Sequence, residues 1–201
     1  DEMLTDLKGN FESYKHHYKD ETNNWFLQHF NQNNGLIESK IECNDFILNT
    51  DDDYNISDYE NAIELLAEDP AKSIEILLRL GEEFEENPLI YYYLGIAFRK
   101  LENYHKAIYY LKESVKRESG ILEVIVELGL NYACIGEFEE AIKYFKKAFE
   151  ASRDVEICTN IIMCYLNLND LENAKLHLDI AKNLNPEDEI VKQLDTMINK
   201  G

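Results

Sequence analysis

The sequence contains few of the residues that interrupt helices or crosslink a chain. It has only 3 prolines and 8 glycines in 201 residues, which favours long helices and short turns over a strand-rich fold. None of its 4 cysteines forms a CxxC pair, and no histidine stands near one at a spacing typical of zinc sites. We therefore expect no metal site and free thiols in a reducing compartment. The four cysteines are Cys43, Cys134, Cys158 and Cys164.

Long hydrophobic runs are also missing. No apolar stretch approaches the length of a membrane span, and no signal peptide is visible. These features predict a cytoplasmic protein, although a leader or anchor removed before Asp1 remains an open alternative.

Basic residues are scarce relative to acidic ones. The chain has 20 Lys and Arg against 40 Asp and Glu, a net charge of −20. This field repels phosphate backbones and anionic lipids, so neither nucleic acid nor a membrane surface is an expected partner. The charge favours a basic partner, but solubility alone explains it equally well. With 45% hydrophobic residues, the chain is expected to fold around a sizeable core.

The most informative pattern present is a period of 34 residues. Each copy has a large apolar residue, then Leu-Gly two positions later, then an aromatic residue, and the two Leu-Gly pairs end at Gly95 and Gly129. Ala107 with Leu111 is repeated by Ala141 with Phe145 at the same separation. A period of this size indicates stacked supersecondary units, none of which can bury its apolar face alone.

This pattern resembles the tetratricopeptide repeat, whose signature combines an aromatic residue, Leu-Gly, a second aromatic, an alanine and a late proline. The resemblance implies an all-α solenoid of stacked antiparallel helix pairs. In it, 57–201 is the repeat array, divided into a degenerate unit 57–87, three units 88–121, 122–154 and 155–187, and a capping helix 188–201. The third unit has Ile162 in place of the glycine. Helices are expected near 88–100, 104–117, 121–135, 138–152, 155–168 and 171–184, with Ser57 to Glu60 as the capping box of the degenerate unit.

Residues 1–56 do not match the repeat and are predicted to be a helical N-terminal extension. An apolar stripe follows a 3-4-3-4 spacing at Leu4, Leu7, Phe11, Tyr14 and Tyr18, as on one helix face. Such a stripe must be buried against something.

Small residues at signature positions should let the two helices of a pair approach closely. These residues are Gly95, Gly129, Ala107, Ala141 and Ala174. The side chains expected to be buried between helices are Tyr91, Leu94, Phe98, Leu128, Tyr132, Ala141 and Phe145.

The resemblance also implies a binding face. In the family, the stripe beside the interhelical core of each first helix lines the concave surface. Here that stripe is mostly apolar, and it consists of Tyr92, Ile96 and Arg99, then Val126, Leu130 and Ala133, then Thr159, Met163 and Leu166. An apolar groove either receives a helical or extended partner segment or is filled by the N-terminal extension. The sequence leaves both alternatives open.

Some members of the family hold an acidic C-terminal peptide with a clamp of Lys, Asn and Arg. Tyr92, Ile96 and Thr159 occupy the corresponding positions here, so an adaptor of that kind is not expected.

Catalytic motifs are missing as well. No phosphate loop, nucleophile elbow or HExxH motif occurs, so we expect neither an enzyme nor a cofactor. An acidic run from Asn49 to Glu60 faintly resembles a calcium loop, but Tyr54 replaces the required glycine, and an acidic turn explains it better. Basic residues on two second helices are expected to pair with neighbouring glutamates; they are Lys112, Lys116, Arg117, Lys143, Lys146 and Lys147.

The sequence therefore predicts a protein- or peptide-binding scaffold or adaptor. The alternative is an acidic inhibitor or immunity-type protein that neutralises a basic partner through surface charge.

Overall fold

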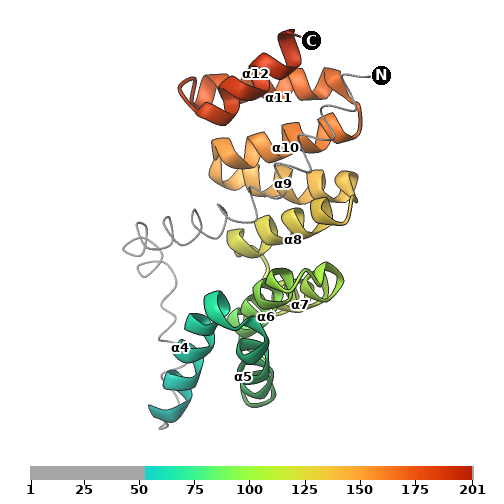
Figure 1. The fold of residues 1–201 in the computed structure, drawn as a ribbon. Helices are drawn as coiled ribbons and strands as arrows, with labels where there is room; N and C mark the ends of the chain where they lie inside the picture. Colours follow the sequence, from blue (N-terminus) through green and yellow to red (C-terminus); the bar gives the residue numbers. More distant parts are fainter. Residues whose placement is uncertain (1–52, 201) are drawn as a thin grey trace. The chain divides into compact units, whose positions relative to one another are not determined.

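The computed structural model describes residues 53–200. Within them every regular element is a helix (Figure 1). The helices are α4 (Asp53–Glu68), α5 (Pro70–Glu83), α6 (Pro88–Lys100), α7 (Tyr104–Arg117), α8 (Leu122–Cys134), α9 (Phe138–Ser152), α10 (Val155–Asn167), α11 (Leu171–Leu184) and α12 (Glu189–Lys200). The predicted all-α fold is confirmed.

The chain divides into two compact units, the first ending at Ile76 and the second beginning at Leu77. In the first unit, α4 and the start of α5 are joined by a hydrogen bond that the buried Ser73 hydroxyl donates to the Ala62 carbonyl, at 2.6 Å. The first half of the division predicted for the chain, residues 1–56, lies almost wholly outside the described residues, so that boundary stays a prediction.

One helix start differs from the expectation. Helix α4 begins at Asp53, so Ser57 lies inside the helix and does not cap it. The acidic residue at the helix start has a physical reason, because the macrodipole stabilises carboxylates in the first turn.

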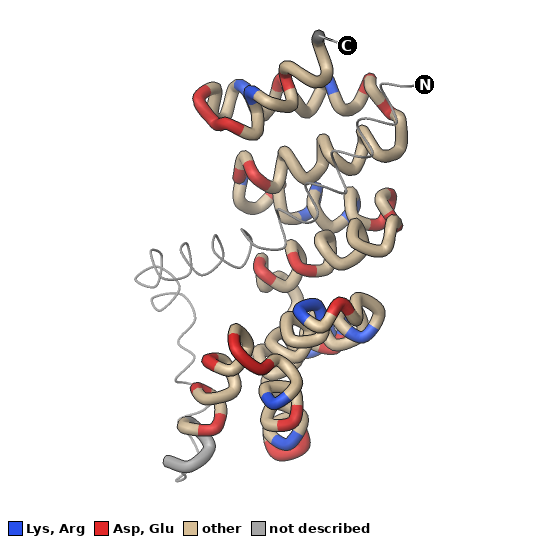
Figure 2. The backbone as a smooth tube through the Cα atoms, in the orientation of Figure 1, with Lys and Arg blue, Asp and Glu red and all other residues tan. Residues whose placement is uncertain are grey.

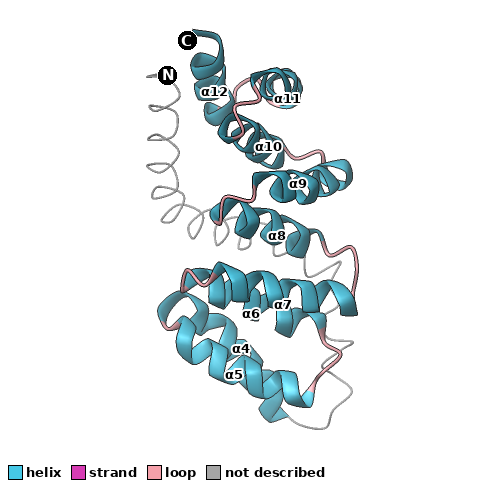
Figure 3. Cartoon of the chain, turned by 90° about the vertical axis from the view of Figure 1, so that its right-hand side faces the viewer, coloured by secondary structure: helices cyan, strands magenta, loops and turns pink. Residues whose placement is uncertain are grey.

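The second unit stacks three helix pairs in chain order, α6 with α7, α8 with α9, and α10 with α11, followed by α12 (Figure 3). Side-chain caps define several starts. Asn87 accepts a hydrogen bond from the Leu89 amide, and Pro88 occupies the first helical position, where its missing N–H is not needed. Asp188 accepts bonds from the Ile190 and Val191 amides at 2.9 and 3.0 Å and so caps α12. The predicted bounds of α6 to α11 agree with the structure to within one residue at each end.

Close approach of the paired helices depends on the two signature glycines. A Cβ added at Gly95 would lie 2.6 Å from Leu111 Cγ, and one at Gly129 would lie 2.6 Å from Phe145 Cε1. Ala107 and Ala141, which precede those two partners by four residues, are fully buried. The predicted role of the small residues in pairing the helices is therefore confirmed.

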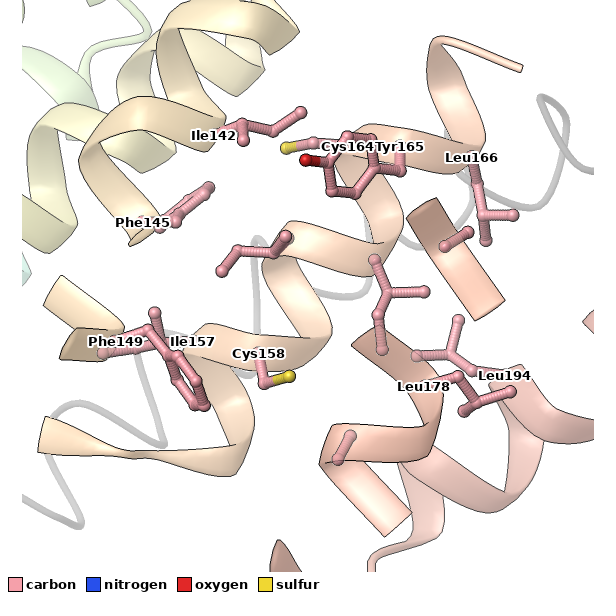
Figure 4. Close-up of a cluster of buried hydrophobic side chains, with 14 of the residues drawn as sticks. Ile142, Phe145, Phe149, Ile157, Cys158, Cys164, Tyr165, Leu166, Leu178 and Leu194 are labelled. Atoms are coloured by element: carbon pink, nitrogen blue, oxygen red, sulfur yellow. The ribbon is translucent and has the colours of Figure 1, made fainter. Parts of the chain in front are cut away.

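The core of the second unit continues through α8 to α12. Figure 4 shows side chains of several helices meeting there, among them Phe145, Cys158, Leu178 and Leu194. Because Val191, Leu194 and Ile198 are buried in the same cluster, α12 covers the end of the described array with one apolar face. This arrangement is what a capping helix requires.

A ring pair recurs in each repeat of the second unit. Phe98 stacks on Tyr110 with centroids 5.2 Å apart, Tyr132 stacks on Tyr144 at 5.4 Å, and Tyr165 lies against His177 at 5.2 Å. Successive pairs are 34 and 33 residues apart, so they occupy equivalent positions.

These pairs also explain two errors in the predicted core. Tyr132 and Tyr91 are only partly buried, since Tyr132 stacks on a partly exposed ring and Tyr91 lies under the Arg117 guanidinium, 3.6 Å from its ring centroid. Both rings keep an edge in solvent where a cation can reach them. The other five predicted core residues are buried.

Candidate functional site

The nine residues predicted to line a groove occupy equivalent positions on α6, α8 and α10. Each of the three helices contributes a triplet with the same internal spacing, and successive triplets are 34 and 33 residues apart. Regular repetition of the helices therefore places the triplets side by side along the first helices of the array.

The structure buries much of this stripe. Tyr92, Ile96, Thr159 and Leu166 are less than 9% exposed. The other five, Arg99, Val126, Leu130, Ala133 and Met163, are partly buried. The apolar surface that a partner could reach without rearrangement is therefore centred on α8 and the middle of α10.

A salt bridge joins the first two triplets' helices. Arg99 on α6 donates from Nε to Glu127 Oε2 at 2.8 Å and from Nη2 to Glu127 Oε1 at 3.3 Å. The Glu127 side chain is 1% exposed and that of Arg99 is 20% exposed. The paired, two-point geometry is the arrangement that a buried carboxylate needs.

Two further polar side chains lie in this region. Asn131 donates from Nδ2 to the Glu127 carbonyl at 2.8 Å, while its Oδ1 is buried without a hydrogen-bond partner. The Tyr92 hydroxyl is likewise buried without a partner among the described residues. Burial, and then the nearby Glu127 carboxylate, raise the pKa of Tyr92 well above its ordinary value. Tyr92 therefore stays a neutral phenol.

Sequence reasoning missed Glu127 and Asn131. Both stand in α8, whose other residues are almost all apolar apart from Glu123. An isolated carboxylate and amide in such a helix are a usable signal, because buried polar groups are retained only when they find partners.

The basic residues of α7 and α9 behave in two ways. Lys116 and Arg117 pair with Glu113, and Lys143 pairs with Glu140, as predicted. The prediction is wrong for Lys112 and Lys146, whose ammonium groups lie over the rings of Tyr132 and Tyr165, both at 5.4 Å from the centroid. For Lys147 the structure shows no carboxylate partner.

Other expectations concern metals and membranes. Among residues 53–200 no group of His, Cys, Asp and Glu is arranged to hold a metal ion. The acidic run compared with a calcium loop is helical from Asp53 onward. No helix in the described part of the chain is long and apolar enough to cross a membrane.

One carboxyl group has an unusual environment. Glu156, in the first turn of α10, is partly buried near Asp154, the N-cap of its own helix, and Asp188, the N-cap of α12. Burial, then repulsion from Asp154 and Asp188, raise the pKa of Glu156 to about 7. Ionised Glu156 is therefore disfavoured where α10 meets α12.

This shift predicts a pH-dependent stability. Above about pH 7 the folded state must hold an ionised Glu156, whereas near pH 4.5 the group is protonated in both states and costs nothing. Glu156→Gln should therefore stabilise the protein by about 1–3 kcal/mol at pH 8, and by progressively less as the pH falls toward 5. Urea unfolding of both proteins from pH 5 to 8 measures this.

Glu172→Gln is the matched control, because Glu172 holds the same second position in α11 and is exposed. An equal gain from both substitutions at pH 8, or a gain that is independent of pH, would contradict the expectation.

Comparison with family models identifies the repeats. Residues 90–119 and 122–155 each match a tetratricopeptide repeat model. These segments contain the helix pairs α6–α7 and α8–α9 described above. This is a tetratricopeptide repeat protein. No protein of curated function matches the sequence.

Solved structures confirm the fold of this tetratricopeptide repeat protein. MamA from Desulfovibrio magneticus RS-1 is 18% identical, with a TM-score of 0.67 over 74% of this chain and 85% of its own. YrrB, described as a TPR protein with an unusual peptide-binding site, is 20% identical, with a TM-score of 0.64 over 71% of this chain and 75% of its own. The Cut9–Hcn1 complex of the APC/C gives a TM-score of 0.63 at 16% identity. At these identities the similarity establishes the fold alone.

Proposed function

We propose that this protein is a scaffold or adaptor that binds a protein or peptide segment on the first-helix face of its repeats. The observation that carries the proposal is the partly buried apolar surface at Val126, Leu130, Ala133 and Met163 within a tetratricopeptide array. Repeat arrays use the extended surface created by stacking to bind other chains. YrrB, with its peptide-binding site, supports a peptide or protein as the class of partner.

The segment that binds there is proposed to be helical or extended, with apolar anchors, since these are the forms that lie in such grooves. A basic segment would suit the net charge of −20. The proposal makes the chain a binding module without catalysis. The family and the structural relatives give no support to the acidic-inhibitor alternative. Whether residues 1–52 bear on the groove lies outside the described residues.

Substitutions on α8 test the binding face. A ligand selected from a displayed peptide library should lose at least tenfold in affinity when Leu130 becomes Asp, because a charge would face its apolar anchors. Ala133→Arg should block the same surface by bulk while leaving the core intact. Titration calorimetry measures both, and circular dichroism checks that each variant folds.

Leu176→Asp is the matched control, since Leu176 is 57% exposed on the second helix α11. Binding that survives both α8 substitutions, or that is lost equally in the control, would exclude this face. Affinity should also change little between low and high salt if apolar contacts dominate.

The charge balance gives a separate expectation. At physiological salt the protein should show no appreciable binding to DNA or RNA, because 40 acidic against 20 basic residues oppose the phosphate field. Retention on a DNA or heparin column at that salt concentration would show this expectation to be wrong.

A further inference from the structure

The recurring ring pairs of the second unit each have a lysine beside them. Lys106 Nζ lies 5.1 Å from the Phe98 ring centroid, Lys112 Nζ lies 5.4 Å from that of Tyr132, and Lys146 Nζ lies 5.4 Å from that of Tyr165. The three rings hold the same place in successive repeats. One ammonium group therefore recurs at the same structural position in each of three repeats, and we call these three lysines the cation row.

The lysines of the cation row differ from the other well-defined lysines of this unit. Lys116, Lys143 and Lys192 each form a salt bridge with a glutamate. By contrast, among the described residues no carboxylate pairs with Lys106, Lys112 or Lys146. Glu140, which influences Lys112, is bonded to Lys143 instead.

All three side chains of the row are exposed. They belong to the second helices α7 and α9, on which Figure 2 shows basic positions. Each ring contact leaves N–H donors of the ammonium available, because Lys carries three donors and a ring face occupies at most one side of it. The ring also restrains a side chain that would otherwise lose considerable entropy on binding.

The charge of the row selects the kind of ligand. Helix α7 carries four basic residues, Lys106, Lys112, Lys116 and Arg117, against the single carboxylate of Glu113. At physiological salt, charges farther away than about 8 Å are largely screened. A ligand in contact with the row therefore meets a positive surface, even though the chain as a whole is acidic.

The spacing of the row suggests the conformation of the ligand. Packed helices lie about 8–10 Å apart, and an extended chain advances about 3.3 Å per residue. One carboxylate at every third residue of an extended segment would therefore match one ammonium per repeat. This register is not available to a helix, in which residues three apart are only about 4.5 Å apart along the axis.

We propose that the cation row is a docking surface for an extended acidic protein segment that places one carboxylate beside Lys106, Lys112 and Lys146 in turn. This surface is separate from the first-helix stripe, and it does not depend on the function proposed for that stripe.

Fluorescence anisotropy with labelled synthetic peptides tests the surface. The probe is a ten-residue peptide with Glu at every third position and Ser and Ala between them. A second peptide has the same composition with its three Glu adjacent, and a third has Lys in place of Glu. We expect the spaced acidic peptide to bind several-fold more tightly than the clustered one, and the basic peptide not to bind this row.

Matched variants locate the binding. Changing Lys106, Lys112 and Lys146 together to Gln should weaken binding of the spaced peptide by about tenfold, as expected for three exposed charge contacts. The control changes Lys116, Lys143 and Lys192 to Gln, which removes the same net charge from lysines that already have carboxylate partners. It should alter affinity by less than about twofold. All six positions are on the surface, so both variants should fold, and circular dichroism verifies this.

Three results would overturn the proposal. One is no anisotropy change with the spaced peptide up to about 1 mM. Another is an equal loss of affinity in the control variant, which would indicate general charge attraction. The third is tighter binding of a ten-nucleotide oligothymidylate than of the spaced peptide, which would assign the row to phosphates.

Discussion

Replacing Gly129 with leucine should lower the free energy of unfolding by more than about 2 kcal/mol. Even a single added Cβ would lie 2.6 Å from Phe145 Cε1 and 2.7 Å from Cδ1. The Phe145 ring is 1% exposed, so it has no free space to move into. The helices α8 and α9 would have to separate, and their separation would propagate to the core that they share with α10.

Alanine substitutions at two glycines separate this steric effect from the general effect of removing glycine. A Cβ at Gly81 in α5 would meet Ile90 Cγ2 at 3.6 Å, an ordinary contact. Gly81→Ala should therefore be neutral or stabilising by up to about 1 kcal/mol, because glycine is unfavourable inside helices. Gly129→Ala should be destabilising. Urea or thermal unfolding measures all three variants, and a Gly129→Leu protein as stable as the wild type would refute the close-packing argument.

The contrast between these glycines shows why the fold could be predicted from the sequence. Positions such as Gly129 and Ala141 tolerate only small residues, because the paired helix lies directly against them. Steric limits of this kind recur in every repeat, so they leave a period in the sequence. Helix starts at Asn87, Pro88 and Asp188 were predictable for a similar reason, since capping requires particular side chains at one position.

Contacts between repeats were less predictable. Arg99 and Glu127 are 28 residues apart, which is not a multiple of the repeat, and neither residue recurs at its position in the other units. Lys112 and Lys146 had two possible partners, a glutamate on the same helix or a ring of the next repeat. Sequence spacing favours the first, whereas the packing of α7 on α8 and of α9 on α10 provides the second.

The exposure of the groove stripe also depended on more than the period. The pattern placed Tyr92 and Ile96 beside the interhelical core, but it could not show how deeply they would be buried. Both are nearly inaccessible, and the polar group that accounts for the charge at this place, Glu127, belongs to the neighbouring helix.

Substituting Arg99 with methionine should destabilise the protein by about 2–4 kcal/mol. Breaking a buried ion pair typically costs 3–5 kcal/mol because an uncompensated charge remains, and the 20% exposure of the Arg99 side chain reduces the penalty here. Glu127 would be left 1% exposed without either of its two guanidinium bonds. Urea unfolding at pH 7 measures the loss, which should shrink as the pH falls and protonation neutralises the carboxylate.

The double variant Arg99→Met with Glu127→Leu decides whether the loss reflects the orphaned charge. Removing both partners leaves an apolar contact between α6 and α8, so the double variant should recover most of the stability that Arg99→Met loses. A double variant less stable than Arg99→Met would mean that Glu127 contributes through its own packing. In that case the ion pair would not be what joins the first helices of the two repeats.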